Sequence, residues 1–219
     1  IKHHLYGFIS VKKNFSAGDW LKLVKNKISQ CHKDKKIPII VGGTGLYFNT
    51  ITKGISKIPN IDRNTRNKVR KLFMNIGHKN FYERLLKIDP KAKNKVLATD
   101  SQRVQRAYEV VLKTKKSLFD WIMDTKSDFI NFEIKKIFLD IPREDLLKKI
   151  FLRTELMFKN NCLEEVKKFS LLKLNKSLSA NKLIGVQEID DYLKGIRTLD
   201  QCKELIIVKT RQYAKRQNT

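Results

Sequence analysis

A glycine-rich turn is the feature of this sequence best suited to chemistry. Residues 42–45 read Gly-Gly-Thr-Gly and directly follow the short apolar run Ile-Pro-Ile-Ile-Val at 37–41. Glycines let the backbone approach a ligand closely and point its N–H groups at an anion. The Thr44 hydroxyl can donate to a phosphate oxygen. A tight turn capped by this threonine explains the pattern equally well. The turn is not a Walker A loop, because no Gly-Lys-Ser/Thr follows it.

Two basic segments could bind a polyanion. In residues 101–110, Arg103 and Arg106 share one face of an expected helix, with Gln102 beside them. These side chains suit contacts to phosphates and base edges. A solvated basic helix, paired with Glu109, is the alternative. Residues 210–217 (Thr-Arg-Gln-Tyr-Ala-Lys-Arg-Gln) are similar, and form either one wall of a basic groove or a solvated face.

The remaining reactive side chains form no motif. The histidines lack metal-ligand spacing, and the carboxylates form no obvious acid–base pair. Cys31, Cys162 and Cys202 are widely separated and include no Cys-x-x-Cys pair. We therefore predict no metal site, no disulfide framework and a reducing, cytoplasmic environment.

The composition favours a nucleic-acid partner. The 219 residues carry a net charge of +25, which indicates a polyanion, although a Lys-rich genome bias would give the same excess. A hydrophobic content of 41% is enough for a core. The apolar runs are too short to cross a bilayer, so we expect no membrane partner. The sequence does not begin with Met and stops abruptly, and we interpret both ends as truncated.

The hydrophobic pattern predicts the elements that position these residues. Short apolar runs at 37–41 and 134–141 are typical of buried strands, and the first leads into the glycine-rich turn. Helical spacing predicts helices at 16–27, 62–73, 79–87, 90–97, 101–112, 143–158, 163–172, 186–195 and 199–217. This order predicts an α/β fold with a parallel sheet. The expected parts are a first core part at 1–60, a helical insertion at 61–132, and a second core part at 133–219.

Six motifs, taken in order, resemble the tRNA dimethylallyltransferase (IPP transferase) family. They are His-His-Leu-Tyr at 3–6, Phe-Ser-Ala at 15–17, Ile-Ile-Val-Gly-Gly-Thr-Gly-Leu-Tyr at 39–47, Ser-Gln-Arg-Val-Gln-Arg-Ala-Tyr-Glu-Val at 101–110, Ile-Gly at 184–185, and the segment 210–217. The resemblance extends over essentially the whole chain. Any one motif is unspecific, but the ordered set is highly specific.

This resemblance implies a fold and an activity. The fold would be a P-loop NTPase-like core, lacking its first strand and P-loop here, with a helical insertion that binds tRNA. The reaction would transfer a dimethylallyl group from dimethylallyl diphosphate to N6 of an adenine adjacent to the anticodon, with Mg²⁺ helping diphosphate to leave. The implied partners are tRNA and dimethylallyl diphosphate, and we expect a monomer. Without the P-loop and the general-base Asp of the family, we expect this fragment alone to be inactive.

The resemblance also implies roles for particular residues. Thr44 would be catalytic and would hold the diphosphate together with Gly42 and Gly43. Gln187 stands where the family commonly has Arg, and we predict that another cation compensates: Arg153 first, with Lys182 and Arg197 as alternatives. The residues implied to contact tRNA are Arg66, Gln102, Arg103, Val104, Gln105, Arg106, Lys182, Gly185, Gln187, Lys215, Arg216 and Gln217.

Two other functions remain open at this point. An isopentenyltransferase that acts on free adenine nucleotides would need no large basic surface. An RNA-binding fragment without catalysis would explain the missing P-loop and the neutral side chain at Gln187.

Overall fold

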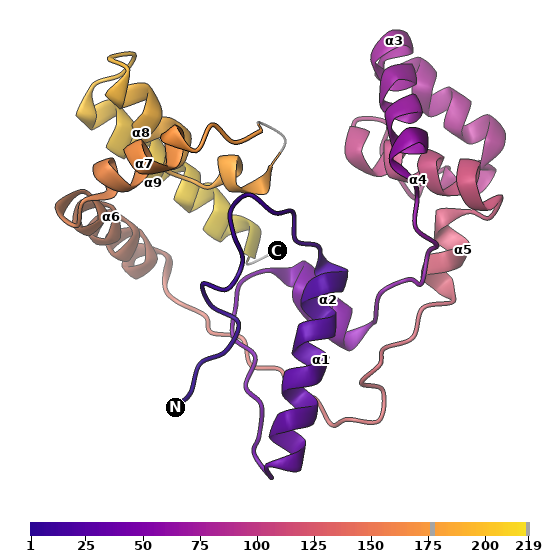
Figure 1. The fold of residues 1–219 in the computed structure, drawn as a ribbon, viewed down its shortest axis with the longest axis horizontal. Coiled ribbons are helices and arrows are strands. Elements are labelled where there is room, and N and C mark those ends of the chain that lie inside the picture. Colours follow the sequence, from indigo (N-terminus) through magenta and orange to yellow (C-terminus); the bar gives the residue numbers. More distant parts are fainter. Residues whose placement is uncertain (176–177, 218–219) are drawn as a thin grey trace. The chain divides into compact units, whose positions relative to one another are not determined.

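The computed structural model describes residues 1–175 and 178–217, whose regular structure is entirely helical (Figure 1). The helices are α1 (Ala17–Lys33), α2 (Gly45–Thr52), α3 (Arg63–Ile88), η1 (Pro90–Ala92), α4 (Ser101–Thr114), α5 (Leu118–Met123), α6 (Arg143–Lys159), α7 (Cys162–Leu171), η2 (Ser179–Lys182), α8 (Val186–Leu193) and α9 (Leu199–Gln217). In these described residues no helix is long and apolar enough to span a membrane.

The α/β fold predicted from the sequence is wrong, because the described residues contain no strand. The two apolar runs at 37–41 and 137–141 are irregular, and none of their residues makes a backbone hydrogen bond within the described chain. Most of their side chains are exposed as well: Ile39 to 79% and Leu139 to 80%, whereas Ile40 is half-buried. A strand exists only through the ladder it forms with a neighbour. A β-branched apolar run is therefore compatible with a strand but cannot by itself make one.

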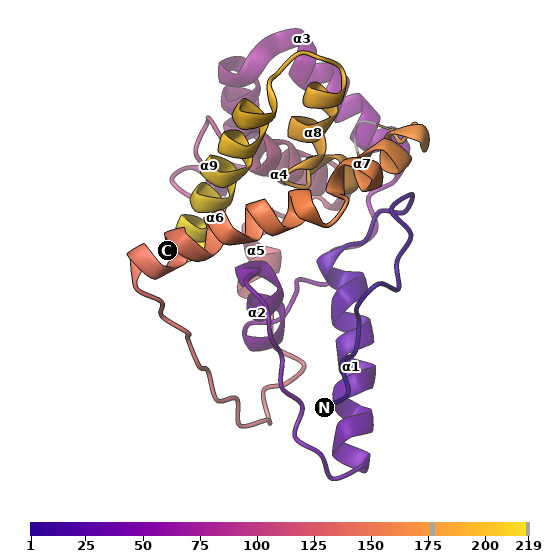
Figure 2. The same ribbon diagram turned by 90° about the vertical axis from the view of Figure 1, so that its left-hand side faces the viewer.

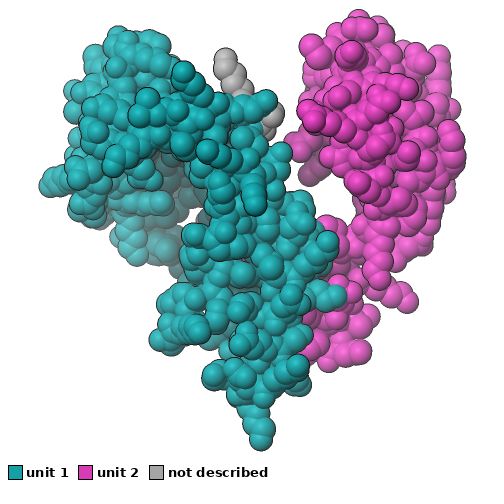
Figure 3. Space-filling view, viewed as in Figure 1, with its two compact units in different colours: residues 1–47, 134–219 teal, residues 48–133 magenta. Residues whose placement is uncertain are grey.

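The chain divides into two compact units, coloured separately in Figure 3. One unit contains residues 1–47 and 134–219, and the other contains residues 48–133. We call them unit 1 and unit 2 and describe each by itself.

Unit 2 is built around the packing of α3 against α4. Its core contains the fully buried Phe81 and Leu85 of α3, and Val104 and Ala107 of α4. The two helices predicted at 62–73 and 79–87 correspond to the two parts of α3, which meet at a kink at Gly77 with φ of 74°. Glycine adopts this left-handed value without a steric penalty, which explains the kink.

The helix predicted at 90–97 is mostly absent. Only the single 3₁₀ turn η1 forms, and the chain then continues through turns to Val96. Asn94 has φ of 62°, a left-handed value that a helix cannot continue through and that asparagine tolerates better than most residues. In this stretch, Asn94 therefore decides the backbone conformation more strongly than the helical spacing of the apolar residues does.

In unit 1, α8 packs against both α7 and α9, and α6 packs against α9 and α7 (Figure 2). The core of these helices contains Cys162, Val166, Ile189, Cys202 and Ile206. Burial raises the pKa of the Cys202 thiol to about 11, so this thiol is protonated at neutral pH. The described cysteines are free thiols.

Helix α1 begins at a capping box. The Ser16 hydroxyl accepts from the backbone N–H of Asp19 at 3.1 Å, and the Asp19 carboxylate accepts from the backbone N–H of Ser16. Leu21, Val24 and Ile28 are buried at helical spacing along the helix. The helix predicted at 16–27 is thus confirmed and continues to Lys33.

Candidate functional site

The glycine-rich turn leads directly into α2. The carbonyl of Thr44 accepts from the backbone N–H of Tyr47 at 3.0 Å, which closes the first turn of the helix. Thr44 is exposed, and its hydroxyl has no hydrogen-bond partner among the described residues. The hydroxyl is therefore not used to cap α2, and it is open to a ligand.

The turn also contacts the end of α9. A Cβ atom placed on Gly43 would lie only 2.6 Å from Cδ of Gln217, whereas Gly42 has open space at the same position. The structure thereby brings together Gly43, which the sequence assigned to the diphosphate, and Gln217, which it assigned to tRNA. The side-chain amide of Gln217 has no partner among the residues described.

An aromatic pair beside the turn was not identified from the sequence. The rings of Trp20 on α1 and Tyr47 on α2 are stacked, with centroids 4.3 Å apart and an interplanar angle of 12°. Both residues are half-buried. The available signal was Tyr47, an aromatic residue three positions after Thr44, although nothing in the sequence indicated that it would meet Trp20.

In unit 2, α4 holds its two arginines in different environments. Asp100 caps the helix and also pairs with Arg103, whose side chain is 78% exposed, at 3.3 Å. Arg106 pairs at 3.3 Å with Glu109, whose side chain is only 10% exposed. The pairing of Arg106 with Glu109 is the one expected for a structural helix, while Arg103 is presented to solvent.

The other predicted residues of α4 differ in their exposure. Gln102 is exposed and Gln105 is half-buried. Val104 lies in the hydrophobic core with 1% of its surface exposed, so its side chain is not presented to a partner.

Arg66 lies one turn into α3. Its Nε atom is buried, and no described group accepts a hydrogen bond from it. The preceding N-cap residue, Asp62, accepts from the backbone N–H of Thr65 and pairs with Lys113 at 3.0 Å. These two interactions lower the pKa of Asp62 well below its usual range. The carboxylate of Asp62 is thus already paired by Thr65 and Lys113.

Gln187 is held by an acidic side chain at the surface of α8. Its Nε2 donates to one oxygen of Asp191 at 2.7 Å, and Nε of Arg197 lies 3.1 Å from the other oxygen. Asp191 thus joins Gln187 to a guanidinium. The other two cations considered from the sequence, Arg153 on α6 and Lys182 at the end of η2, are exposed.

The segment before α8 is fixed by a buried carboxylate. Gly185 has φ of 102°, a value that favours glycine, and its N–H donates at 2.7 Å to Glu188, which also pairs with Lys209 of α9. Burial alone would raise the pKa of Glu188, but the hydrogen bonds from Lys209 and from backbone N–H groups lower it overall. Farther along α9, Lys215 and Arg216 are exposed at its last turn.

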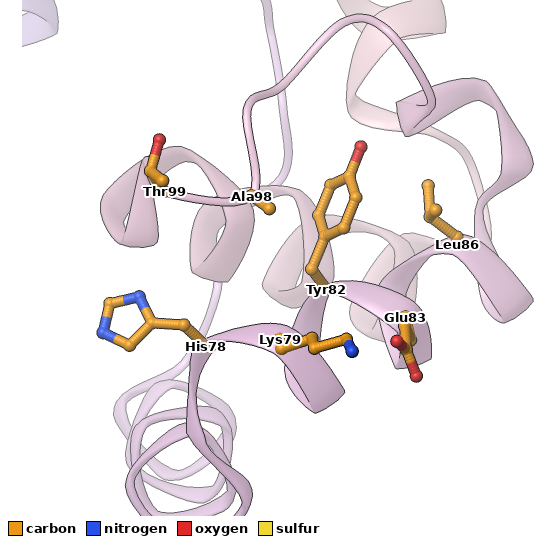
Figure 4. Close-up of a pocket in the computed structure, with 7 residues that line it drawn as sticks. All are labelled: His78, Lys79, Tyr82, Glu83, Leu86, Ala98 and Thr99. Atoms are coloured by element: carbon orange, nitrogen blue, oxygen red, sulfur yellow. The ribbon is translucent and has the colours of Figure 1, made fainter.

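A separate hollow lies in unit 2, between the second part of α3 and the segment before α4 (Figure 4). It has a volume of about 620 Å³ and is lined by His78, Lys79, Tyr82, Glu83, Leu86, Ala98 and Thr99. None of the residues that the sequence assigned to a site lines it.

The described residues contain no cluster of three or more His, Cys, Asp or Glu side chains that could hold a metal ion.

An open hydroxyl in a glycine-rich turn and arginine-bearing helices suit a protein that brings a phosphorylated small molecule to a nucleic acid. A sequence model of the family described as IPP transferase matches residues 1–219, and the chain belongs to that family.

Named relatives support this membership. The tRNA dimethylallyltransferase of Pelagibacter ubique (strain HTCC1062) is 51% identical over 219 residues, which cover 100% of this chain and 70% of that protein. The tRNA dimethylallyltransferase of Wolbachia sp. subsp. Drosophila simulans (strain wRi) is 40% identical over 219 residues, covering 99% of this chain and 74% of that protein.

Solved structures agree with the family. The full-length tRNA isopentenylpyrophosphate transferase of Bacillus halodurans matches 99% of this chain and 67% of its own, with a TM-score of 0.63 and 27% identity. A eukaryotic dimethylallyltransferase acting on tRNA matches 95% of this chain and 53% of its own, with a TM-score of 0.80 and 26% identity.

Proposed function

We propose that the protein transfers a dimethylallyl group from dimethylallyl diphosphate to N6 of an adenine adjacent to the anticodon of tRNA. N6 forms a bond to C1 of the dimethylallyl group, the bond from C1 to the diphosphate oxygen breaks, and N6 loses a proton. Diphosphate is the leaving group. The observation that carries the proposal is the 51% identity, over all 219 residues, to a protein named tRNA dimethylallyltransferase. A monomer acting in the cytoplasm, where tRNA is available, belongs to the same proposal.

At the glycine-rich turn, Thr44 is proposed to donate its hydroxyl hydrogen to the diphosphate. The backbone of Gly42 and Gly43 would come close to the same group. Support comes from the exposed hydroxyl of Thr44, which has no partner among the described residues. A donor that is already oriented stabilises the negative charge that develops on the leaving group.

The positive charge near the diphosphate is proposed to come from an arginine other than residue 187. The side-chain amide of Gln187 already donates a hydrogen bond to Asp191. In addition, a neutral amide attracts an anion less strongly than a guanidinium does. Arg153 is exposed and remains the first proposed source. Arg197 is the alternative, because it shares Asp191 with Gln187.

Binding of tRNA is proposed to use basic and amide residues in both units. In unit 2 these are Arg66, Gln102, Arg103, Gln105 and Arg106. In unit 1 they are Lys182, Gly185, Gln187, Lys215, Arg216 and Gln217. The net charge of +25 supports a polyanionic substrate.

Mg²⁺ enters the proposal only as a companion of the diphosphate. Mg²⁺ is usually bound by one or two carboxylates together with substrate phosphates. The described residues offer no acidic cluster, so we assign no residue of this chain to the metal and derive no step through it.

The test is to compare acceptors with isotopically labelled dimethylallyl diphosphate and the full-length protein. We expect label in tRNA, and none in free adenine nucleotides. Label in free nucleotides alone would support a nucleotide isopentenyltransferase instead. Binding of tRNA without any transfer would support an RNA-binding protein without catalysis.

A further inference from the structure

We propose that Trp20 is a positioning residue for Thr44 and acts through the stacked ring of Tyr47. The inference rests on the role proposed for Thr44 at the diphosphate. It concerns a residue on α1, which does not belong to the glycine-rich turn itself.

The first step is the contact between the two rings. Their centroids lie 4.3 Å apart at an interplanar angle of 12°, so the rings are stacked nearly face to face. Aromatic pairs attract each other beyond their burial in offset-stacked and in edge-to-face arrangements, and the small interplanar angle here corresponds to the stacked one. The stack therefore fixes both the position and the orientation of the Tyr47 ring.

The second step joins Tyr47 to Thr44. The backbone N–H of Tyr47 donates to the carbonyl of Thr44 at 3.0 Å, within the first turn of α2. Any displacement of Tyr47 thus moves the peptide that carries the Thr44 side chain. On its other side Thr44 is preceded by Gly42 and Gly43, which do not restrict the backbone.

The third step concerns the anchor at the other end of the stack. Trp20 lies in the first turn of α1, where its backbone N–H donates to the carbonyl of the N-cap residue Ser16 at 3.0 Å. Leu21 and Val24, next to it on α1, are buried. The irregular run at 37–41 before the turn makes no backbone hydrogen bond in the described chain, so it supplies no comparable anchor.

The experiment uses the full-length protein and two substitutions of Trp20. Trp20→Leu keeps an apolar side chain but removes the aromatic face, whereas Trp20→Phe keeps a face. We expect Trp20→Leu to lower kcat about tenfold with a smaller change in KM for tRNA. Trp20→Phe should recover activity to within about threefold of the native protein. Trp121→Leu in unit 2 serves as the matched control for loss of a tryptophan.

A double variant tests whether Trp20 acts through Thr44. In a Thr44→Ala background we expect Trp20→Leu to cost less than about twofold, because the hydroxyl that it positions is already gone. A full tenfold loss in that background would overturn the proposal, and so would equal losses for Trp20→Leu and Trp20→Phe.

A second measurement does not depend on activity. Hydrogen exchange of the Tyr47 amide should become about tenfold faster in Trp20→Leu and stay near native in Trp20→Phe. Unchanged exchange would overturn the positioning role even if transfer occurs. If the Tyr47 amide exchanges faster in Trp20→Leu but the protein transfers no dimethylallyl group, the stacked pair still anchors the turn. Only the proposed function is then contradicted.

Discussion

At the scale of single residues, a substitution of Thr44 separates a catalytic role of its hydroxyl from a helix-capping role. If its hydroxyl stabilises the departing diphosphate, Thr44→Ala should raise the activation barrier by about 2.7–4 kcal/mol, the typical loss for a preorganised donor. The free energy of unfolding should fall by less than ~1 kcal/mol, because the hydroxyl caps no helix among the described residues. Turnover and urea unfolding measure the two effects. Native turnover combined with a lower melting temperature would make Thr44 a structural residue.

The contact between Gly43 and Gln217 gives a second residue-scale prediction. An alanine methyl at Gly43 would displace the Gln217 amide, whereas Gly42→Ala fills open space. We expect Gly43→Ala to weaken binding of tRNA three- to tenfold, about 0.7–1.4 kcal/mol, because Gln217 is proposed to contact tRNA, and Gly42→Ala to change it less than twofold. Calorimetric titration measures both. In a Gln217→Ala background the two alanine variants should bind alike, and a persistent difference would show that Gln217 is not involved.

Glu188 gives a prediction for pH dependence. Its pKa is lowered on folding, so its ionised form stabilises the folded protein above the pKa of the unfolded chain, near 4.5. This stability is lost as the pH falls through the lower pKa of the folded state. Glu188→Gln should therefore destabilise the protein by about 1–2 kcal/mol at pH 7, and the difference should shrink below pH ~4. Urea unfolding at several pH values checks this, and a difference independent of pH would contradict it.

At the scale of elements, most of the long helices could be predicted from the sequence, whereas α5 was missed, the helix at 90–97 was wrong and the two predicted strands were wrong. Helical spacing is a local property, and it correctly located α1, α4, α6, α7, α8 and α9. A strand depends on a partner that the local sequence does not contain. Ile39 and Leu139 illustrate this, because they look like core residues in the sequence and are exposed in the structure.

The residues proposed for the candidate site could be proposed from the sequence only where they belong to a motif. The glycine-rich turn and the basic helices were found from residue types and their order. The meeting of Trp20 with Tyr47 and of Gly43 with Gln217 could not be found, because each joins residues from separate helices or turns. Val104 lies in the core, although the family pattern included it among the tRNA contacts.

Helix α4 is the element whose role in tRNA binding can be isolated. Replacing Arg103 and Arg106 together by Ala should weaken tRNA binding and leave the affinity for dimethylallyl diphosphate unchanged. The slope of log affinity against log salt should fall by roughly 0.7–0.9 for each phosphate that the helix no longer neutralises. The double variant Lys12→Ala and Lys13→Ala removes the same charge from exposed residues of unit 1 and serves as the control. Equal weakening for both ligands would make α4 a structural helix.

At the scale of the whole molecule, the two units have separate hydrophobic cores. A substitution in one core can therefore be interpreted without repacking the other. The net charge of +25 is a property of the chain as a whole and favours any polyanion, so charge alone cannot select tRNA. The activity rests on family membership, and the specificity must come from the individual residues proposed here.

The most direct test of the proposed activity is to locate the product in the tRNA. Full-length protein, dimethylallyl diphosphate and unmodified tRNA are incubated, and the tRNA is digested with nucleases and analysed by mass spectrometry. We predict a dimethylallyl group on N6 of one adenosine, in the fragment that contains the anticodon loop. A folded, tRNA-binding protein that leaves this adenosine unmodified, or that modifies adenosines elsewhere in the tRNA, would contradict the proposed activity.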